Sequence, residues 1–157
     1  MVREIIAILR GVTPHEVAGI AEELILSGIT KIEVPLNSPN AYESIEILAN
    51  RFLSEAVIGA GTVLAKSEVS LVWNSGGKMI VSPNVNVDVI RETKKLSMRS
   101  YPGVFTATEC FEAVQNGSDG LKLFPAFLMG VEGLKALRAV LPLSLIHISE
   151  PTRQFRI

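Results

Sequence analysis

The sequence is poor in the residues that build disulfide, metal and nucleic-acid sites. It has one cysteine, Cys110, and two histidines, His15 and His147. A single cysteine excludes an intrachain disulfide, and we expect it to be a small buried residue. The histidines stand far apart without the spacing of metal ligands, so a histidine-rich metal site is not expected. A net charge of −1 gives no electrostatic argument for binding nucleic acid or an anionic membrane.

Long hydrophobic segments are also missing. No apolar run approaches the length of a membrane span, and the first ten residues carry charges at Arg3 and Glu4 without the long apolar region of a signal peptide. We therefore expect a soluble, cytoplasmic protein. The chain has 157 residues, 48% of them hydrophobic, which is enough for one domain with a sizeable core.

The sequence does contain a repeated alternation of short apolar runs and amphipathic segments. We expect six strands, each followed by a helix whose apolar residues recur at helical spacing. Thr13 is expected to cap the first helix, and Ser38 or Asn37 the second. The expected strands are 4–9, 31–34, 56–58, 78–81, 99–101 and 118–125, and the expected helices are 14–28, 39–52, 66–74, 87–96, 106–114 and 131–140.

This alternation is typical of an α/β protein in which helices cover a parallel sheet. The sheet can be open or closed into a barrel, and the alternation alone does not decide between them. Distinctive residues lie at the C-terminal end of every expected strand: Arg10, Glu33, 59–62, 83–84, 102–103 and 122–125. Because β/α barrels build their active sites at that end, this distribution favours a barrel.

Lys122 lies in the middle of the apolar run 118–125. If it points into a barrel or crevice, the loss of water favours its uncharged amine, which can form a Schiff base with a ketone. The alternative is a solvated lysine on an edge strand.

Glu33 stands between Ile32 and Val34, where a carboxylate is costly unless it is paired or neutral. It is either a general acid and base or the partner of Arg10 in a structural ion pair. Arg10 can alternatively clamp a substrate carboxylate.

The segment Gly-Ala-Gly-Thr at 59–62 lets backbone approach a ligand and offers the Thr62 hydroxyl, although a tight turn also explains it. Pro83 is most simply a strand end, and Phe124 most simply a core residue. Taken together, an amine, a carboxylate, a guanidinium and a hydroxyl at one end of the fold fit carbonyl chemistry on a small anionic keto acid better than they fit a binding module.

An ordered set of motifs resembles the 2-keto-3-deoxy-6-phosphogluconate/6-phosphogalactonate aldolase family. The motifs are I-A-I-L-R-G-V-T-P at 6–14, I-E-V-P-L-N-S-P at 32–39, I-G-A-G-T-V-L at 58–64, V-S-P-N at 81–84, Y-P-G-V-F-T-A-T-E at 101–109 and L-K-L-F-P at 121–125. The resemblance implies a (β/α)₈ TIM barrel, a homotrimer, and a class I aldolase that needs no metal or other cofactor. A different phosphate-binding barrel enzyme, such as an isomerase, is disfavoured by the presence of both Lys122 and Glu33.

The resemblance also implies roles for individual residues. Lys122 would be the Schiff-base lysine and Glu33 the general acid and base. The keto-acid end of the substrate would contact Arg10, Thr62 and Pro83, with Phe124 beside the lysine.

The loop after Glu33 resembles the phosphogalactonate branch of the family. The phosphogluconate branch tends to carry threonine and arginine where this sequence has Pro35 and Asn37. The implied reaction is cleavage of 2-dehydro-3-deoxy-6-phosphogalactonate to pyruvate and glyceraldehyde 3-phosphate. The alternatives are the corresponding phosphogluconate aldolase and a non-catalytic truncated fragment of either enzyme.

The resemblance ends at about residue 142, before the seventh and eighth strands whose Gly-Gly and Gly-Ser loops hold the substrate phosphate in the family. Residues 143–153, L-S-L-I-H-I-S-E-P-T-R, resemble the translation of a sequencing-library adapter. We therefore hypothesise a partial barrel of about six units over 1–142 and a non-native tail over 143–157, which resequencing of the locus would test.

Two further expectations follow from this ending. The alternation in L-S-L-I-H-I permits a seventh strand by accident, and a barrel without its last units should expose strand edges and apolar core and tend to aggregate. A second departure is A-F-L-M-G at 126–130, which adds apolar bulk next to the Lys122 loop where the family usually has small or hydroxyl residues.

Overall fold

Strands and helices alternate along the computed structural model, which describes residues 5–141 and 146–148. The elements are β1 (Ile6–Ile8), α1 (Pro14–Leu26), β2 (Lys31–Pro35), α2 (Ala41–Arg51), β3 (Val57–Gly61), α3 (Lys66–Asn74), β4 (Met79–Val81), α4 (Val87–Lys95), β5 (Arg99–Tyr101), β6 (Gly103–Val104), α5 (Ala107–Gln115), β7 (Leu121–Leu123), α6 (Ala126–Val140) and β8 (Ile146–Ile148). The predicted alternation is therefore confirmed, and β6 is an additional short strand directly after β5.

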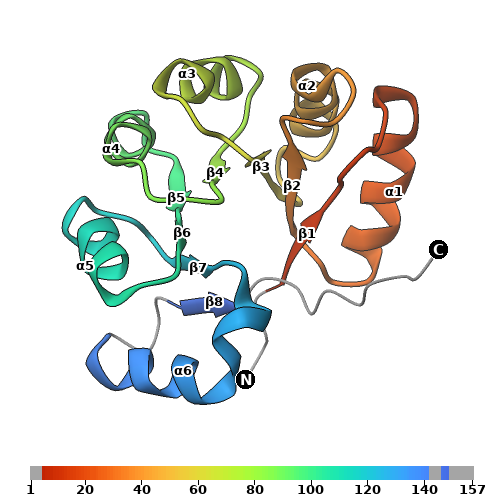
Figure 1. The fold of residues 1–157 in the computed structure, drawn as a ribbon. Helices are drawn as coiled ribbons and strands as arrows, with labels where there is room; N and C mark the ends of the chain where they lie inside the picture. Colours follow the sequence, from red (N-terminus) through yellow and green to blue (C-terminus); the bar gives the residue numbers. More distant parts are fainter. Residues whose placement is uncertain (1–4, 142–145, 149–157) are drawn as a thin grey trace.

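Every strand pairing in the described part of the chain is parallel. Strands β1 to β5 form one sheet in sequence order, and β6 to β8 form a second sheet in sequence order. Seen end-on, the strands follow one another around an arc and helices α1 to α6 lie on its outer side (Figure 1). Among the described strands no pairing joins β8 to β1, so the ring of strands is not closed.

Strand β8 extends the second sheet beyond the six predicted units by pairing with β7. It falls in L-S-L-I-H-I, where the alternation permitted a strand. The predicted boundary at residue 142 and the rest of the predicted tail lie outside the described residues.

The core lies between the strands and the helices that cover them. Ile32 and Val34 of β2 are fully buried, as are Ile45 and Leu48 of α2 and Val17 of α1. A second cluster, which includes Cys110 as a buried residue, packs α5 against β7. Helix α6 differs from the others because none of its residues is fully buried.

The predicted cap of α2 is wrong. The helix begins at Ala41 after Asn40, whose backbone is left-handed (φ 45°), and not at Pro39. The reason is that Ser38 is used elsewhere: its hydroxyl accepts a hydrogen bond from Gly11 N (3.0 Å) and lies 3.5 Å from Leu9 O, to which it donates. Ser38 thus links the loop after β2 to the loop after β1 and fixes these two loops relative to each other.

Helix α6 also differs from the prediction at its start. It begins at Ala126, five residues before the predicted Val131, and its backbone breaks at Gly130 (φ 67°). The apolar segment after Lys122 is therefore helical, and it leaves Phe127, Leu128 and Val131 exposed.

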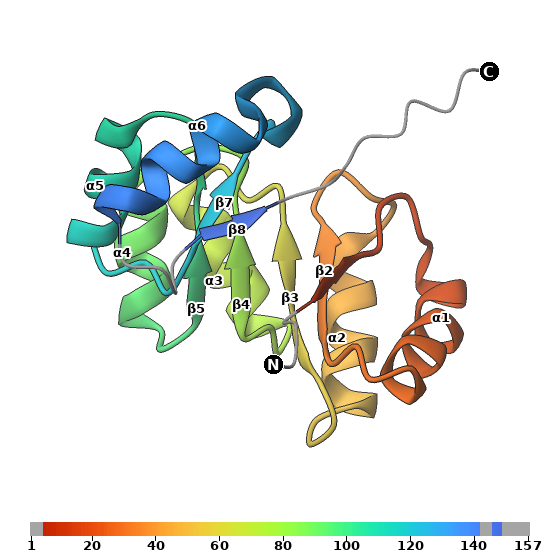
Figure 2. The same ribbon diagram turned by 90° about the horizontal axis from the view of Figure 1, so that it is seen from below.

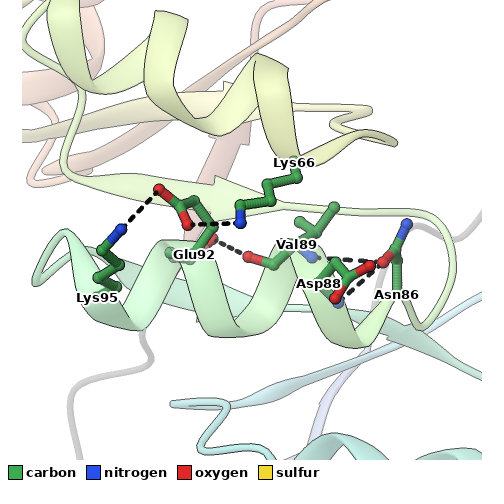
Figure 3. A network of polar contacts seen from close by, with 7 residues as sticks. Lys66, Asn86, Asp88, Val89, Glu92 and Lys95 are labelled. Atoms are coloured by element: carbon green, nitrogen blue, oxygen red, sulfur yellow. Dashed lines mark hydrogen bonds and ion pairs between the residues drawn. The ribbon is translucent and has the colours of Figure 1, made fainter.

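Helices α3 and α4 are joined by a polar network (Figure 3). The Nζ atoms of the exposed Lys66 and Lys95 side chains lie 3.4 Å and 3.9 Å from the nearly buried carboxylate of Glu92. Asn86 caps α4 by accepting hydrogen bonds from Asp88 N (3.0 Å) and Val89 N (3.3 Å). The contact between Lys66 and Glu92 fixes α4 against α3.

Candidate active site

The residues proposed from the sequence lie at the carboxyl ends of the strands. Strands β2 to β5 run side by side with their arrowheads toward the same end (Figure 2). Glu33 lies in β2 and Lys122 in β7, while Arg10, Thr62, Pro83 and Phe124 lie in the loops that follow β1, β3, β4 and β7. In parallel β/α architectures this end carries the active site.

Lys122 and Glu33 approach each other in a nearly dry environment. Lys122 Nζ lies 4.0 Å from Glu33 Oε1, and their side chains are 14% and 3% exposed. The two residues are far apart in the sequence and come from different sheets. A buried ion pair costs desolvation energy that mutual attraction only partly offsets, so such a pair is weak evidence for stability and better evidence for a function.

The local sequence explains why Lys122 points inward. Successive side chains of a strand alternate between its two faces, and Leu121 and Leu123 on either side of Lys122 are buried. The backbone is held in register by Lys122 N donating to Pro102 O (2.9 Å) and Phe124 N donating to Val104 O (3.1 Å). The inward placement, and not the solvated edge-strand alternative, is the one observed.

The simplest interpretation of the sequence placed Phe124 in the core, and this is wrong. It is 40% exposed, and Lys122 Nζ lies 5.4 Å from the centroid of its ring. This distance is within the range of a cation–π contact. Phe124 therefore borders the lysine on the side toward solvent.

Arg10 is exposed in the loop after β1. Its Nη1 donates a long hydrogen bond to Asn37 Oδ1 (3.4 Å), and both side chains are exposed. Arg10 thus contacts Asn37 in the loop after β2, and Glu33 lies next to Lys122. An exposed guanidinium that makes one long hydrogen bond to the described part of the chain retains donors for a carboxylate.

Thr62 adopts an unusual backbone conformation directly after β3. Its φ is 56°, which a β-branched residue rarely adopts and which costs on the order of 1–3 kcal/mol. Strain of this kind persists where the surrounding structure enforces it, often at a functional site.

The loops after β3 and β4 are tied together around Thr62 and Pro83. Val63 N donates to Val81 O (3.3 Å), Ser82 Oγ donates to Val63 O (2.7 Å), and Asn86 Nδ2 donates to Leu64 O (3.0 Å). Pro83 itself is half-buried beside Gly103, where a Cβ atom would strike the Pro83 backbone. The two loops therefore present Thr62 and Pro83 as one unit.

Two contributors to the site were not identified from the sequence. Ser38 was expected to cap a helix, and Gly61 was expected at most to let backbone approach a ligand. Gly61 instead lies against the carboxylate of Glu33. A glycine near a strand end signals close approach, but the sequence does not show which atom approaches.

The described part of the chain shows no group of three or more histidine, cysteine, aspartate or glutamate residues that could hold a metal ion. Within the same part, no helix is long and apolar enough to span a membrane. One hollow of about 200 Å³ lies at the opposite end of the fold, between the C-terminal ends of α1 and α2. Two of the charged groups that line it are paired with each other, because Arg51 Nη2 lies 2.8 Å from Glu22 Oε2.

Comparisons with known proteins agree with this geometry. A family model described as "Aldolase: KDPG and KHG aldolase" matches residues 2–148. The chain is 47% identical over 142 residues to a probable 2-dehydro-3-deoxy-6-phosphogalactonate aldolase of Rhizobium meliloti, covering 90% of the chain and 67% of that protein. It is 42% identical to the 2-dehydro-3-deoxy-6-phosphogalactonate aldolase of Escherichia coli K12, covering 88% and 67%.

Solved structures give the same result. A native KDPGal structure superimposes with a TM-score of 0.87 at 41% identity, covering 90% of this chain and 69% of that one. The KDPG aldolase of Legionella pneumophila, with pyruvate captured as a covalent carbinolamine, superimposes with a TM-score of 0.85 at 29% identity, covering 93% and 71%. The chain thus spans about two thirds of the length of these relatives, and it belongs to the KDPG and KHG aldolase family.

Proposed function

We propose that the chain carries the carbon–carbon bond chemistry of a class I aldolase that cleaves 2-dehydro-3-deoxy-6-phosphogalactonate to pyruvate and glyceraldehyde 3-phosphate. The observation that carries the proposal is the contact between Lys122 and Glu33, which places an amine and a carboxylate 4.0 Å apart in a nearly dry site. The relatives at 42–47% identity support the galactonate substrate. The KHG/KDPG aldolase of Escherichia coli K12 is 30% identical, which gives the phosphogluconate alternative less support.

The reaction begins at the lysine. The amine form of Lys122 attacks the C2 ketone, and the resulting carbinolamine loses water to give an iminium ion. Glu33 supplies and accepts the protons of these steps, because its carboxylate is the acid–base group next to Nζ.

Cleavage follows from the iminium. A base removes the proton of the C4 hydroxyl, the C3–C4 bond breaks, and its electron pair moves into the iminium to form an enamine. Glyceraldehyde 3-phosphate leaves as the aldehyde. Protonation of the enamine at C3 and hydrolysis of the pyruvate iminium then regenerate the Lys122 amine.

The remaining residues would bind the keto-acid end of the substrate. Arg10 has donors for the carboxylate, Thr62 offers a hydroxyl from the strained loop after β3, and Pro83 forms the adjoining wall. Phe124 would cover the lysine and limit access of water.

The proposal extends to the assembled enzyme. The complete protein would be a closed (β/α)₈ barrel whose last units supply the phosphate site, and it would work as a homotrimer in the cytoplasm. The parallel α/β architecture and the solved relatives support the barrel.

The test is an assay of pyruvate release from both C4 epimers, the phosphogalactonate and the phosphogluconate substrates. We expect faster release from the galactonate epimer and none from Lys122→Arg. No release from either epimer, with a full-length relative active under the same conditions, would contradict the proposal and support the non-catalytic fragment.

A further inference from the structure

The face of β3 that meets Glu33 has glycine at both positions 59 and 61. Glu33 pairs in register with Gly59, and Pro35 pairs with Gly61. Residues two apart on a strand lie on the same face, so Gly59 and Gly61 both lie on the face to which Glu33 projects. Glycine in a strand weakens the strand, and this cost suggests that close approach is needed here.

The two glycines have different neighbours. A Cβ atom on Gly59 would strike backbone and Cβ atoms of Met79 in the next strand. A Cβ atom on Gly61 would overlap Glu33 Oε2 and lie 2.5 Å from Glu33 Cδ and 3.2 Å from Oε1, and these are its three nearest atoms. Gly59 thus accommodates a neighbouring strand, whereas Gly61 accommodates one carboxylate.

The carboxylate of Glu33 is therefore placed between two contacts. Its Oε2 lies over Gly61, and its Oε1 lies 4.0 Å from Lys122 Nζ. A side chain at position 61 would occupy the place of Oε2 and move the carboxylate of Glu33, whose side chain is only 3% exposed.

We propose that Gly61 is a positioning residue for proton transfer. Because it has no side chain, it leaves the space in which the Glu33 carboxylate lies close to Lys122. This inference rests on the proposed function, because it takes Glu33 as the proton shuttle of the Lys122 adduct. Gly61 would act on the reaction only through Glu33.

The direct test is Gly61→Ala. The φ of Gly61 is not in the left-handed region, so alanine fits the backbone, and the displaced atoms are the end of one side chain. We expect the variant to fold and to form the pyruvate imine on Lys122. Exchange of the pyruvate methyl protons with solvent deuterium, followed by NMR, should slow by about tenfold to a hundredfold.

A double-mutant cycle separates positioning from a general structural role. In the Glu33→Ala background there is no carboxylate for a side chain at position 61 to displace. Adding Gly61→Ala should therefore leave the residual exchange rate unchanged. The melting temperature should stay the same or rise slightly. Gly59→Ala is the contrast, because its overlap with Met79 does not involve Glu33, and it should lower the melting temperature equally in both backgrounds.

The outcomes are distinguishable from failure of the proposed function. If the wild-type chain forms no pyruvate imine on Lys122, the proposed function fails. If the imine forms and Gly61→Ala exchanges protons at the wild-type rate, or if its losses add to those of Glu33→Ala, the positioning role is wrong.

Discussion

Glu33 Oε1 lies 4.0 Å from Lys122 Nζ across the carboxyl ends of β2 and β7. Neither residue would be expected inside a protein alone, since each charge loses its hydration there. Placing them together puts an amine and a carboxylate at the same point, which is what the proposed Schiff-base chemistry requires.

Replacement of Glu33 by glutamine should remove proton transfer while keeping the shape of the side chain. General acid–base catalysis contributes about 10²–10⁴-fold, so we expect pyruvate release and methyl-proton exchange to fall by that order. NMR exchange rates measure the loss. Glu46→Gln, an exposed position on α2, is the matched control and should exchange at the wild-type rate; an equal loss in both variants would refute the role of Glu33.

Replacement of Thr62 by glycine should separate stability from binding. Glycine relieves the strain of φ 56°, which offsets its entropic cost, so the free energy of unfolding should stay constant or rise by about 1 kcal/mol. The KM for the keto acid should rise because the hydroxyl is lost. Thr62→Ser keeps the hydroxyl and should bind normally. Thermal melts measure the stability and steady-state kinetics measure the KM. A less stable Thr62→Gly variant would contradict the claim that the backbone at Thr62 is strained.

Replacement of Asn86 by alanine should loosen the loops after β3 and β4. The change removes the cap of α4 and the bond to Leu64 O, and loss of a cap typically costs about 0.5–2 kcal/mol. Chemical denaturation measures it. The neighbouring Asn84→Ala loses only a 3.4 Å contact to Val85 O and should be near neutral; similar losses in both would argue against the tie between the loops.

The first turn of α5 should make stability depend on acid pH. Hydrogen bonds from Phe105 N (2.8 Å) and Thr106 N (2.8 Å) hold the pKa of Glu109 below its usual value. A folded-state pKa below the unfolded one gives stability that is present above about pH 4.5 and lost as pH falls through the folded pKa.

Glu109→Gln should therefore cost about 1 kcal/mol at neutral pH and flatten this acid dependence. Urea denaturation between pH 3 and pH 7 measures both effects. Glu112→Gln, on the exposed side of the same helix, should keep the wild-type slope. A slope unchanged by Glu109→Gln would show that the cap does not contribute.

Much of the fold follows from local pattern. Helix α3 has the predicted bounds, and Lys122 and Glu33 were placed at the same end of the strands because parallel strands share that end. Non-local contacts were not predictable. Ser38 carries the signature of a helix cap, but its hydroxyl bonds to the loop after β1. Gly61 has the signature of a turn, and only the register of β2 against β3 brings Glu33 to it.

The central claim is that Lys122 is an activated amine in this chain, and borohydride trapping with pyruvate tests it most directly. Soluble protein is treated with pyruvate and borohydride and analysed by intact and peptide mass spectrometry, with a full-length relative as positive control. We predict a pyruvate-derived adduct on the peptide that carries Lys122, and none in Lys122→Arg. Unmodified protein, or an adduct on another lysine, would contradict the account.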